Sequence, residues 1–165
     1  MALDLYDVSA PAFLRGLKAL SALLDKALAQ GFDEAALMQA QLAPDMRPLP
    51  NQVRMAAFSA RGCVARLTGL DWPVTDDNEA TFAELQATIA LSIAFIESVP
   101  REAFVGAEDR DVVLKFPNGQ FDFKGAQYLT GFALPNFYFH VTTAYALLRA
   151  AGVEIGKRDY LGAPG

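Results

Sequence analysis

The sequence has little of the residue chemistry on which most enzymes depend. Its 165 residues include one histidine, His140, and one cysteine, Cys63. A single cysteine excludes a disulfide within the chain and gives no support to secretion. A single histidine excludes a zinc-protease helix, which needs two histidines four residues apart, and a di-iron bundle, which needs Glu-x-x-His motifs on two helices. Glycine-rich phosphate loops are also missing from the sequence.

Basic residues are scarce as well. The chain has 14 Lys and Arg residues against 19 Asp and Glu residues, a formal net charge of −5, and no basic cluster. Proteins that bind nucleic acid contact its phosphates through such clusters, so we expect no nucleic-acid partner. Residues 1–7 are acidic and lack the basic start and apolar core of a signal peptide. We therefore expect a cytoplasmic protein.

Apolar residues are abundant. They make up 53% of the chain, and residues 125–148 contain no Asp, Glu, Lys or Arg. That run has the length of a membrane span, but Gly131, Pro135, Asn136 and His140 interrupt it, and such residues are costly in lipid. We interpret it as a buried or interface-facing helix rather than a membrane segment. This charge-free run and the mean hydropathy of +0.19 indicate more apolar surface than a monomer usually exposes. We therefore predict a homodimer.

Hydrophobic periodicity predicts one mostly α domain over residues 1–165, built as a four-helix bundle. Ser9 is the expected N-cap of the first helix, and Thr81 with Glu84 forms a capping box at the third. The expected long helices cover residues 9–31, 51–67, 81–100 and 135–152. A short helical turn is expected at 33–39, and the proline-rich residues 43–50 should form a rigid connector.

A small β-hairpin is predicted between the third and fourth helices. Residues 111–116 and 120–124 are rich in strand-forming residues, and Asn118-Gly119 between them is a strong hairpin signal. Because two strands alone are marginally stable, the hairpin must pack on the bundle or on a second chain.

The densest group of unusual residues lies at the start of the fourth helix. Asn136, Tyr138 and His140 lie among aromatic residues there, either as an aromatic core and subunit interface or as a pocket for a small molecule. In the second interpretation Gln52 adds a polar group from the second helix, and Asp45 and Arg47 form the rim. Cys63 with His140 could form a nucleophile and base, but a cysteine in the middle of a helix is typically a small buried hydrophobe.

Several short motifs carry a family resemblance. The most specific is Leu-Pro-Asn-Phe-Tyr-Phe-His at 134–140, and further motifs are Ala-Pro-Asp-Met at 43–46, Ala-Arg-Leu at 65–67 and Thr-Thr-Ala-Tyr at 142–145. Together they resemble an uncharacterised bacterial family, the domain-of-unknown-function family nineteen-ninety-three, which is a branch of the DinB-like superfamily. The resemblance covers residues 6–162. The resemblance implies a DinB-like four-helix bundle that is often dimeric.

The resemblance also carries an expectation about metals. Other branches of the superfamily bind a divalent metal through three histidines and include thiol-dependent transferases and isomerases. Of their His-x-x-x-His pair on the fourth helix only His140 is present here, since position 144 is an alanine, and the second helix has no histidine. A divalent metal is therefore possible but not favoured, and we expect no cofactor.

The sequence leaves three functions open. The first is a protein that binds a small molecule near the start of the fourth helix, with no assignable reaction. The second is a metal-dependent hydrolase or a thiol-dependent transferase of the DinB-like type. The third is a non-catalytic structural or interaction dimer.

Overall fold

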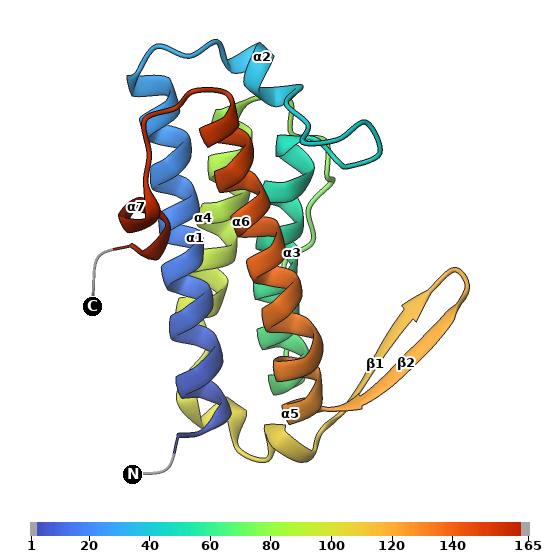
Figure 1. Cartoon of the computed structure of the whole chain (residues 1–165). Helices are drawn as coiled ribbons and strands as arrows, with labels where there is room; N and C mark the ends of the chain where they lie inside the picture. Colours follow the sequence, from blue (N-terminus) through green and yellow to red (C-terminus); the bar gives the residue numbers. More distant parts are fainter. Residues whose placement is uncertain (1–2, 163–165) are drawn as a thin grey trace.

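The computed structural model describes residues 3–162, which form a four-helix bundle with a projecting β-hairpin (Figure 1). The long helices are α1 (Leu5–Ala29), α3 (Leu49–Thr68), α4 (Phe82–Ser98) and α6 (Leu134–Ala150). Helix α3 packs against α4 and α6, and α1 packs against the same two helices. The predicted bundle is therefore confirmed over the described residues, and the terminal residues of the expected domain lie outside them.

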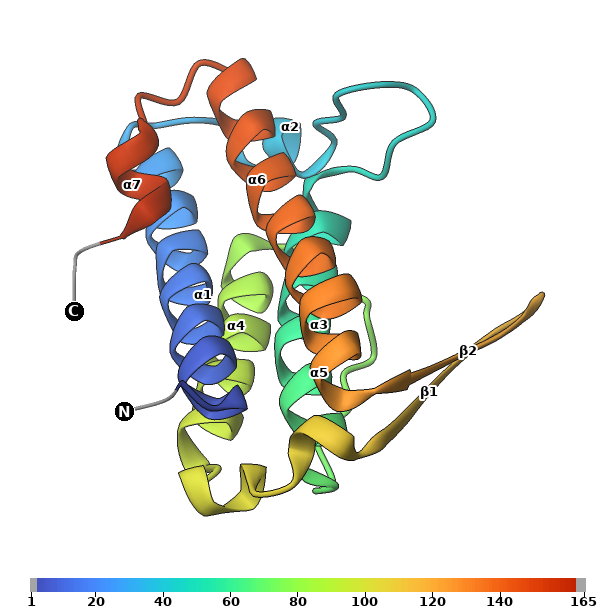
Figure 2. The same ribbon diagram turned by 60° about the horizontal axis from the view of Figure 1, so that its bottom comes forward.

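Short elements connect the long helices. Helix α2 (Glu34–Met38) follows α1 with Asp33 as its N-cap, and α7 (Lys157–Leu161) lies against α1 near the C-terminus. The 3-10 turns η1 (Arg101–Phe104) and η2 (Ala107–Asp109) lead from α4 into the hairpin. Figure 2 shows these turns at the end of the bundle from which the hairpin leaves.

The start of α1 differs from the prediction. The helix begins at Leu5, and Asp4 is its N-cap, with Asp7 completing a capping box. Ser9 lies inside the helix, where its hydroxyl donates a hydrogen bond to the Leu5 carbonyl. The expected Ser9 cap is thus wrong, because the two aspartates already satisfy amide groups at the helix start. The Thr81–Glu84 capping box of α4 is present as expected.

The hairpin consists of the antiparallel strands β1 (Asp111–Phe116) and β2 (Gly119–Lys124), as predicted. The cross-strand pairs Val112–Phe123, Leu114–Phe121 and Phe116–Gly119 place alternate residues on one face. Val112 and Leu114 of this face are buried against the bundle. The far end of the hairpin projects away from the helices in both ribbon views.

The last long helix is preceded by helical structure, which agrees with the interpretation of residues 125–148 as a helix but begins before the expected start at residue 135. Helix α5 (Gly125–Tyr128) continues through a π-helical turn, η3 (Leu129–Ala133), into α6, so the backbone is helical from Gly125 onward. The Leu134 amide donates to the carbonyl of Leu129, five residues earlier. Pro135 lacks an amide hydrogen and does not terminate the helix here, because the wider π turn precedes it.

The core runs along the interior of the bundle and is almost entirely apolar. Apart from Arg61 and Tyr128, its largest fully buried side chains are Phe13, Phe82, Phe137 and leucines of α1, α3 and α4. No single helix of residues 3–162 is long and apolar enough to cross a bilayer. Helix α4 and the turns that follow it, residues 101–109, reach the required length and apolar composition only when taken together, and these two segments meet at a bend of 85°.

Candidate functional site

His140 and Gln52 face each other across the α3–α6 contact. The His140 Nδ1 lies 2.8 Å from the Gln52 Oε1, and the Gln52 Nε2 donates to the carbonyl of Arg47 at 2.9 Å. The second bond fixes the orientation of the amide, so its oxygen faces the imidazole and can only accept. The His140 ring therefore carries its proton on Nδ1. Burial lowers the pKa of His140 below its ordinary value, which favours the neutral ring.

Two further polar pairs follow along the same face of α3, one with α6 and one with α5. Asn136 Nδ2 donates to Ser59 Oγ at 2.6 Å, and Arg66 Nη1 donates to the Tyr128 hydroxyl at 3.2 Å. We call the three pairs Gln52–His140, Ser59–Asn136 and Arg66–Tyr128 the polar ladder. Its α3 members lie at positions 52, 59 and 66, seven residues apart, so they share one face of the helix. This spacing is the sequence signal that could have identified Ser59 and Arg66.

A cavity of about 300 Å³ lies between the hairpin and two pairs of the polar ladder, Ser59–Asn136 and Arg66–Tyr128. We call it the hairpin cavity. Its apolar lining comes from α3, β1 and the η3–α6 segment, and its polar lining includes the residues of those two pairs. The lining residues are Met55, Phe58, Ser59, Arg66, Val113, Leu114, Lys115, Phe116, Tyr128, Phe132, Ala133 and Asn136.

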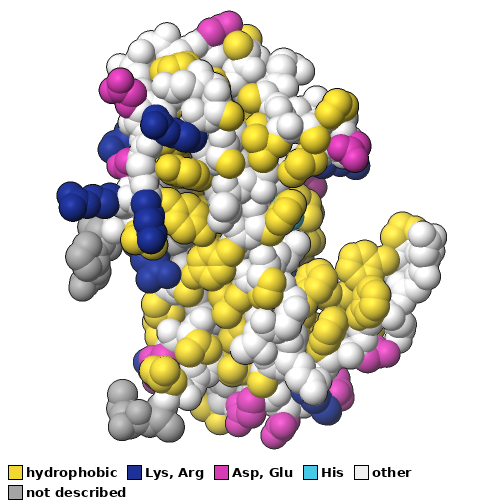
Figure 3. Space-filling view, in the orientation of Figure 1, with side chains coloured by type: hydrophobic (Ala, Val, Ile, Leu, Met, Phe, Trp, Pro, Cys, Tyr) yellow, Lys and Arg dark blue, Asp and Glu magenta, His cyan; other side chains and the backbone are white. Residues whose placement is uncertain are grey.

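The aromatic face of the hairpin is directed toward this cavity. The Phe123 ring packs against the rings of Tyr128 and Phe132, with both centroid distances 6.1 Å. Farther out, Phe116 and Phe121 contact each other at 5.7 Å and remain exposed. In the space-filling view, hydrophobic side chains line the hairpin side that faces the bundle, and a notch opens between the outer part of the hairpin and the helices (Figure 3).

Aromatic rings hold the side chain of Arg66 in place. The guanidinium carbon lies 5.3 Å from the Trp72 ring centroid, 5.8 Å from that of Phe58 and 6.0 Å from that of Tyr128. Trp72 can lie this close to α3 because residue 62 is glycine. A Cβ atom there would lie 2.8 Å from the indole and 2.6 Å from Arg66 Nη1.

A second arginine of α3 serves the fold rather than the cavity. Arg61 is 1% exposed and donates to Ser92 Oγ at 2.9 Å and Thr75 Oγ1 at 2.8 Å. Burial lowers the pKa of this guanidinium, and the neighbouring carboxylates of Asp77 and Glu79 oppose that effect. Arg61 thus ties the loop between α3 and α4 to the bundle.

The six residues predicted to line a pocket do not form one site. Gln52 and His140 are together, and Asn136 lies one turn along α6 on the same face. Tyr138 instead faces α1, where its hydroxyl accepts a hydrogen bond from Arg15 Nη2 at 3.3 Å. Asp45 and Arg47 lie exposed in the connector before α3, and Arg47 contributes its backbone carbonyl to Gln52. Only Asn136 of the six lines the hairpin cavity.

The residues do not fit the three-histidine metal site of other DinB-like branches. The α3 position facing His140 is the amide of Gln52, and Ala144, one turn beyond His140, is fully buried. Residues 3–162 contain no group of three or more His, Cys, Asp or Glu residues placed to hold a metal ion. One imidazole and one amide oxygen make a poor first shell for zinc or nickel. Cys63 is no ligand or nucleophile in this state, because burial strongly raises the pKa of its thiol.

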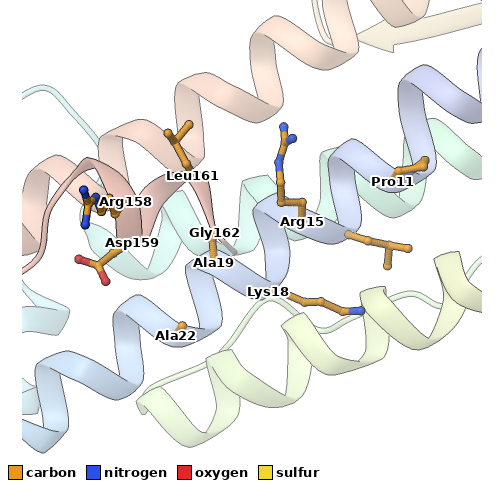
Figure 4. Close-up of a pocket in the computed structure, with 10 residues that line it drawn as sticks. Pro11, Arg15, Lys18, Ala19, Ala22, Arg158, Asp159, Leu161 and Gly162 are labelled. Atoms are coloured by element: carbon orange, nitrogen blue, oxygen red, sulfur yellow. The ribbon is translucent and has the colours of Figure 1, made fainter. Parts of the chain in front are cut away.

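A larger depression of about 970 Å³ lies between α1 and α7. Figure 4 shows the lining residues, among them Arg15 and Lys18 on α1 and Arg158 and Asp159 on α7. Two of these charges already have partners, because Lys18 pairs with Glu97 at 2.8 Å and Asp159 pairs with Lys26. The depression contains none of the six predicted residues and none of the polar ladder.

The comparisons with known proteins place the chain in a family. A family model described as "Domain of unknown function (DUF1993)" matches residues 5–161, so the chain belongs to this family. The crystal structure of a DinB family member protein from Shewanella denitrificans is similar, with a TM-score of 0.88 and 38% sequence identity. The match covers 97% of this chain and 93% of that one. No curated protein matches. The predicted family and DinB-like fold are thereby confirmed.

Proposed function

We propose that this DUF1993 protein binds a small organic molecule in the hairpin cavity, next to the start of α6. The observation that carries the proposal is the composition of the cavity wall. Apolar side chains from α3, β1 and the η3–α6 segment surround a few polar groups that come from α3, α5, α6 and β1. A volume of about 300 Å³ lies at the lower end of the range for small-molecule sites, about 300–1,000 Å³.

The surroundings of the cavity also suit a binding site. The π turn η3 contributes Phe132 and Ala133 to its wall, and π turns within helices are often found at functional sites. The exposed rings of Phe116 and Phe121 continue the apolar surface beyond the cavity. A ligand that covers them would remove apolar surface from water, which stabilises the complex.

A neutral aromatic probe tests this proposal. Trp72 is the only tryptophan, and its ring lies 5.0 Å from that of Phe58 in the cavity wall. Phenylbutanol added to ¹⁵N-labelled protein should therefore shift the Trp72 indole resonance in a saturable manner. Met55→Phe adds an aromatic ring at the cavity wall and should weaken binding about tenfold, a loss of about 1.4 kcal/mol.

Leu91→Phe on α4 is the matched control. Leu91 is 39% exposed and Met55 is 40% exposed, but Leu91 lines none of the cavities described above. Phenylbutanol should bind the Leu91→Phe protein as it binds the unchanged chain. Absence of any saturable shift, or equal weakening by both substitutions, would refute the hairpin cavity as the binding site.

A further inference from the structure

The charges of the hairpin cavity are all of one sign. Arg66 and Lys115 line it, and no Asp or Glu is among its described lining residues. The protein as a whole has a net charge of −5, so a purely cationic lining departs from the composition of the chain. Over residues 3–162, neither Arg66 nor Lys115 forms an ion pair.

The hydrogen-bonding groups of the cavity also include donors without acceptors. A guanidinium has five N–H donors, and within the described chain Arg66 uses one of them, toward the Tyr128 hydroxyl. Tyr128 is 2% exposed, and its own hydroxyl proton meets no acceptor among residues 3–162. The Ser59 hydroxyl accepts from Asn136, which leaves its proton free to be donated. Three residues with unused donors thus line one largely apolar cavity.

From these observations we infer that the hairpin cavity takes an amphipathic monocarboxylate, with the carboxylate on Arg66 and the hydrocarbon against the aromatic face of the hairpin. The planar guanidinium presents paired N–H groups that match the two oxygens of a carboxylate. Its stacking near Trp72, Phe58 and Tyr128 holds that plane in place before binding. The hydroxyl groups of Tyr128 and Ser59 supply further donors. The inference rests on the proposed function, because it names the class of molecule that the same cavity binds.

The test compares phenylbutyrate with phenylbutyramide, which has nearly the same shape and no charge. Dissociation constants are measured for both by titration calorimetry and by the Trp72 indole resonance. Phenylbutyrate should bind about 10- to 100-fold more tightly, as expected for hydrogen bonds to a charged group. Arg66→Gln should abolish this preference and leave phenylbutyramide binding nearly unchanged.

Three further variants guard against trivial explanations. Arg15→Gln removes an equal charge from α1, outside the cavity, and should keep the preference for phenylbutyrate. Arg66→Lys retains the charge without the planar fork and should keep only part of the preference, which also serves if Arg66→Gln does not fold. Tyr128→Phe should weaken phenylbutyrate selectively, because it removes one donor and keeps the ring.

The outcomes separate the inference from the proposed function. Equal affinity for the two probes would overturn the carboxylate inference and leave the hairpin cavity as a small-molecule site. Failure of both probes and of phenylbutanol to bind would overturn the proposed function itself. A preference for phenylbutyrate that survives in Arg66→Gln would show that another group holds the carboxylate, and the assignment to Arg66 would be wrong.

Discussion

Replacing His140 by alanine should destabilise the protein by about 1–3 kcal/mol, the cost of leaving a buried polar group without its partner. The partner in question is Gln52 Oε1, which accepts from the imidazole at 2.8 Å on a residue that is 3% exposed. The Gln52 amide cannot turn to solvent without losing its bond to the Arg47 carbonyl. For a chain of this length the midpoint of thermal unfolding should fall by about 2–12 °C.

The assay is a double-mutant cycle measured by urea unfolding at pH 8. His140→Ala and Gln52→Leu should each destabilise the protein, and the double variant should cost less than the sum because neither polar group is then left unpaired. Leu91→Phe is again the control for substitution on a helix surface. Additive effects of the two single substitutions would show that the side chains do not interact. A loss of unfolding free energy below about 0.5 kcal/mol for His140→Ala would place this substitution in the range of ordinary surface changes.

The same residue predicts a pH dependence with a definite sign. Burial lowers the pKa of His140 in the folded protein, whereas the unfolded chain has the ordinary value of about 6.5. Between these values the unfolded state holds more protons, so stability rises with pH. The contribution of the neutral ring is complete above about pH 6.5 and is lost as the pH falls through the folded pKa. NMR titration of the single imidazole gives that pKa directly, and a value at or above 6.5 would contradict its burial.

Three further predictions concern the fold, metals and assembly. Gly62→Ala should cost about 1–3 kcal/mol in urea unfolding because its Cβ would overlap Trp72, whereas Gly131→Ala, with open space around its Cβ, should not destabilise the protein. Elemental analysis of untagged protein should give well under one equivalent of zinc or nickel; a stoichiometric metal lost in His140→Ala would contradict this. Light scattering after size exclusion should give about twice the chain mass of 17.8 kDa. A clean monomer at micromolar concentration would refute the predicted homodimer.

Local signals predicted most of the fold because each acts over a few residues. The Thr81–Glu84 capping box and the Asn118-Gly119 turn bring their own hydrogen-bonding geometry, and both structures formed where expected. The π turn before α6 was not predicted. A proline at position 135 is compatible with a new helix or with a widened turn in a continuing one, and the packing of the following helix decides between them.

The candidate site was predictable only in part. Residues four apart share a face of a helix, so Asn136 and His140 point the same way, and Tyr138 between them points toward α1. Helical spacing alone should therefore have separated Tyr138 from the other two. The hairpin cavity was beyond sequence reasoning, because it depends on how a hairpin from residues 111–124 lies over α3 and α6.

The polar ladder suggests a division of roles along α3. At the Gln52–His140 end the amide is fully used, with its oxygen toward the imidazole and its nitrogen toward the Arg47 carbonyl. At the Arg66–Tyr128 end Arg66 lines the hairpin cavity, and its guanidinium donates one hydrogen bond, to the Tyr128 hydroxyl, within the described residues. Satisfied polar groups specify how helices pack, whereas unsatisfied donors beside a cavity suit a ligand. His140 draws attention as the only imidazole in the sequence, but on this argument it stabilises the helix pair, and the chemistry of binding belongs to Arg66.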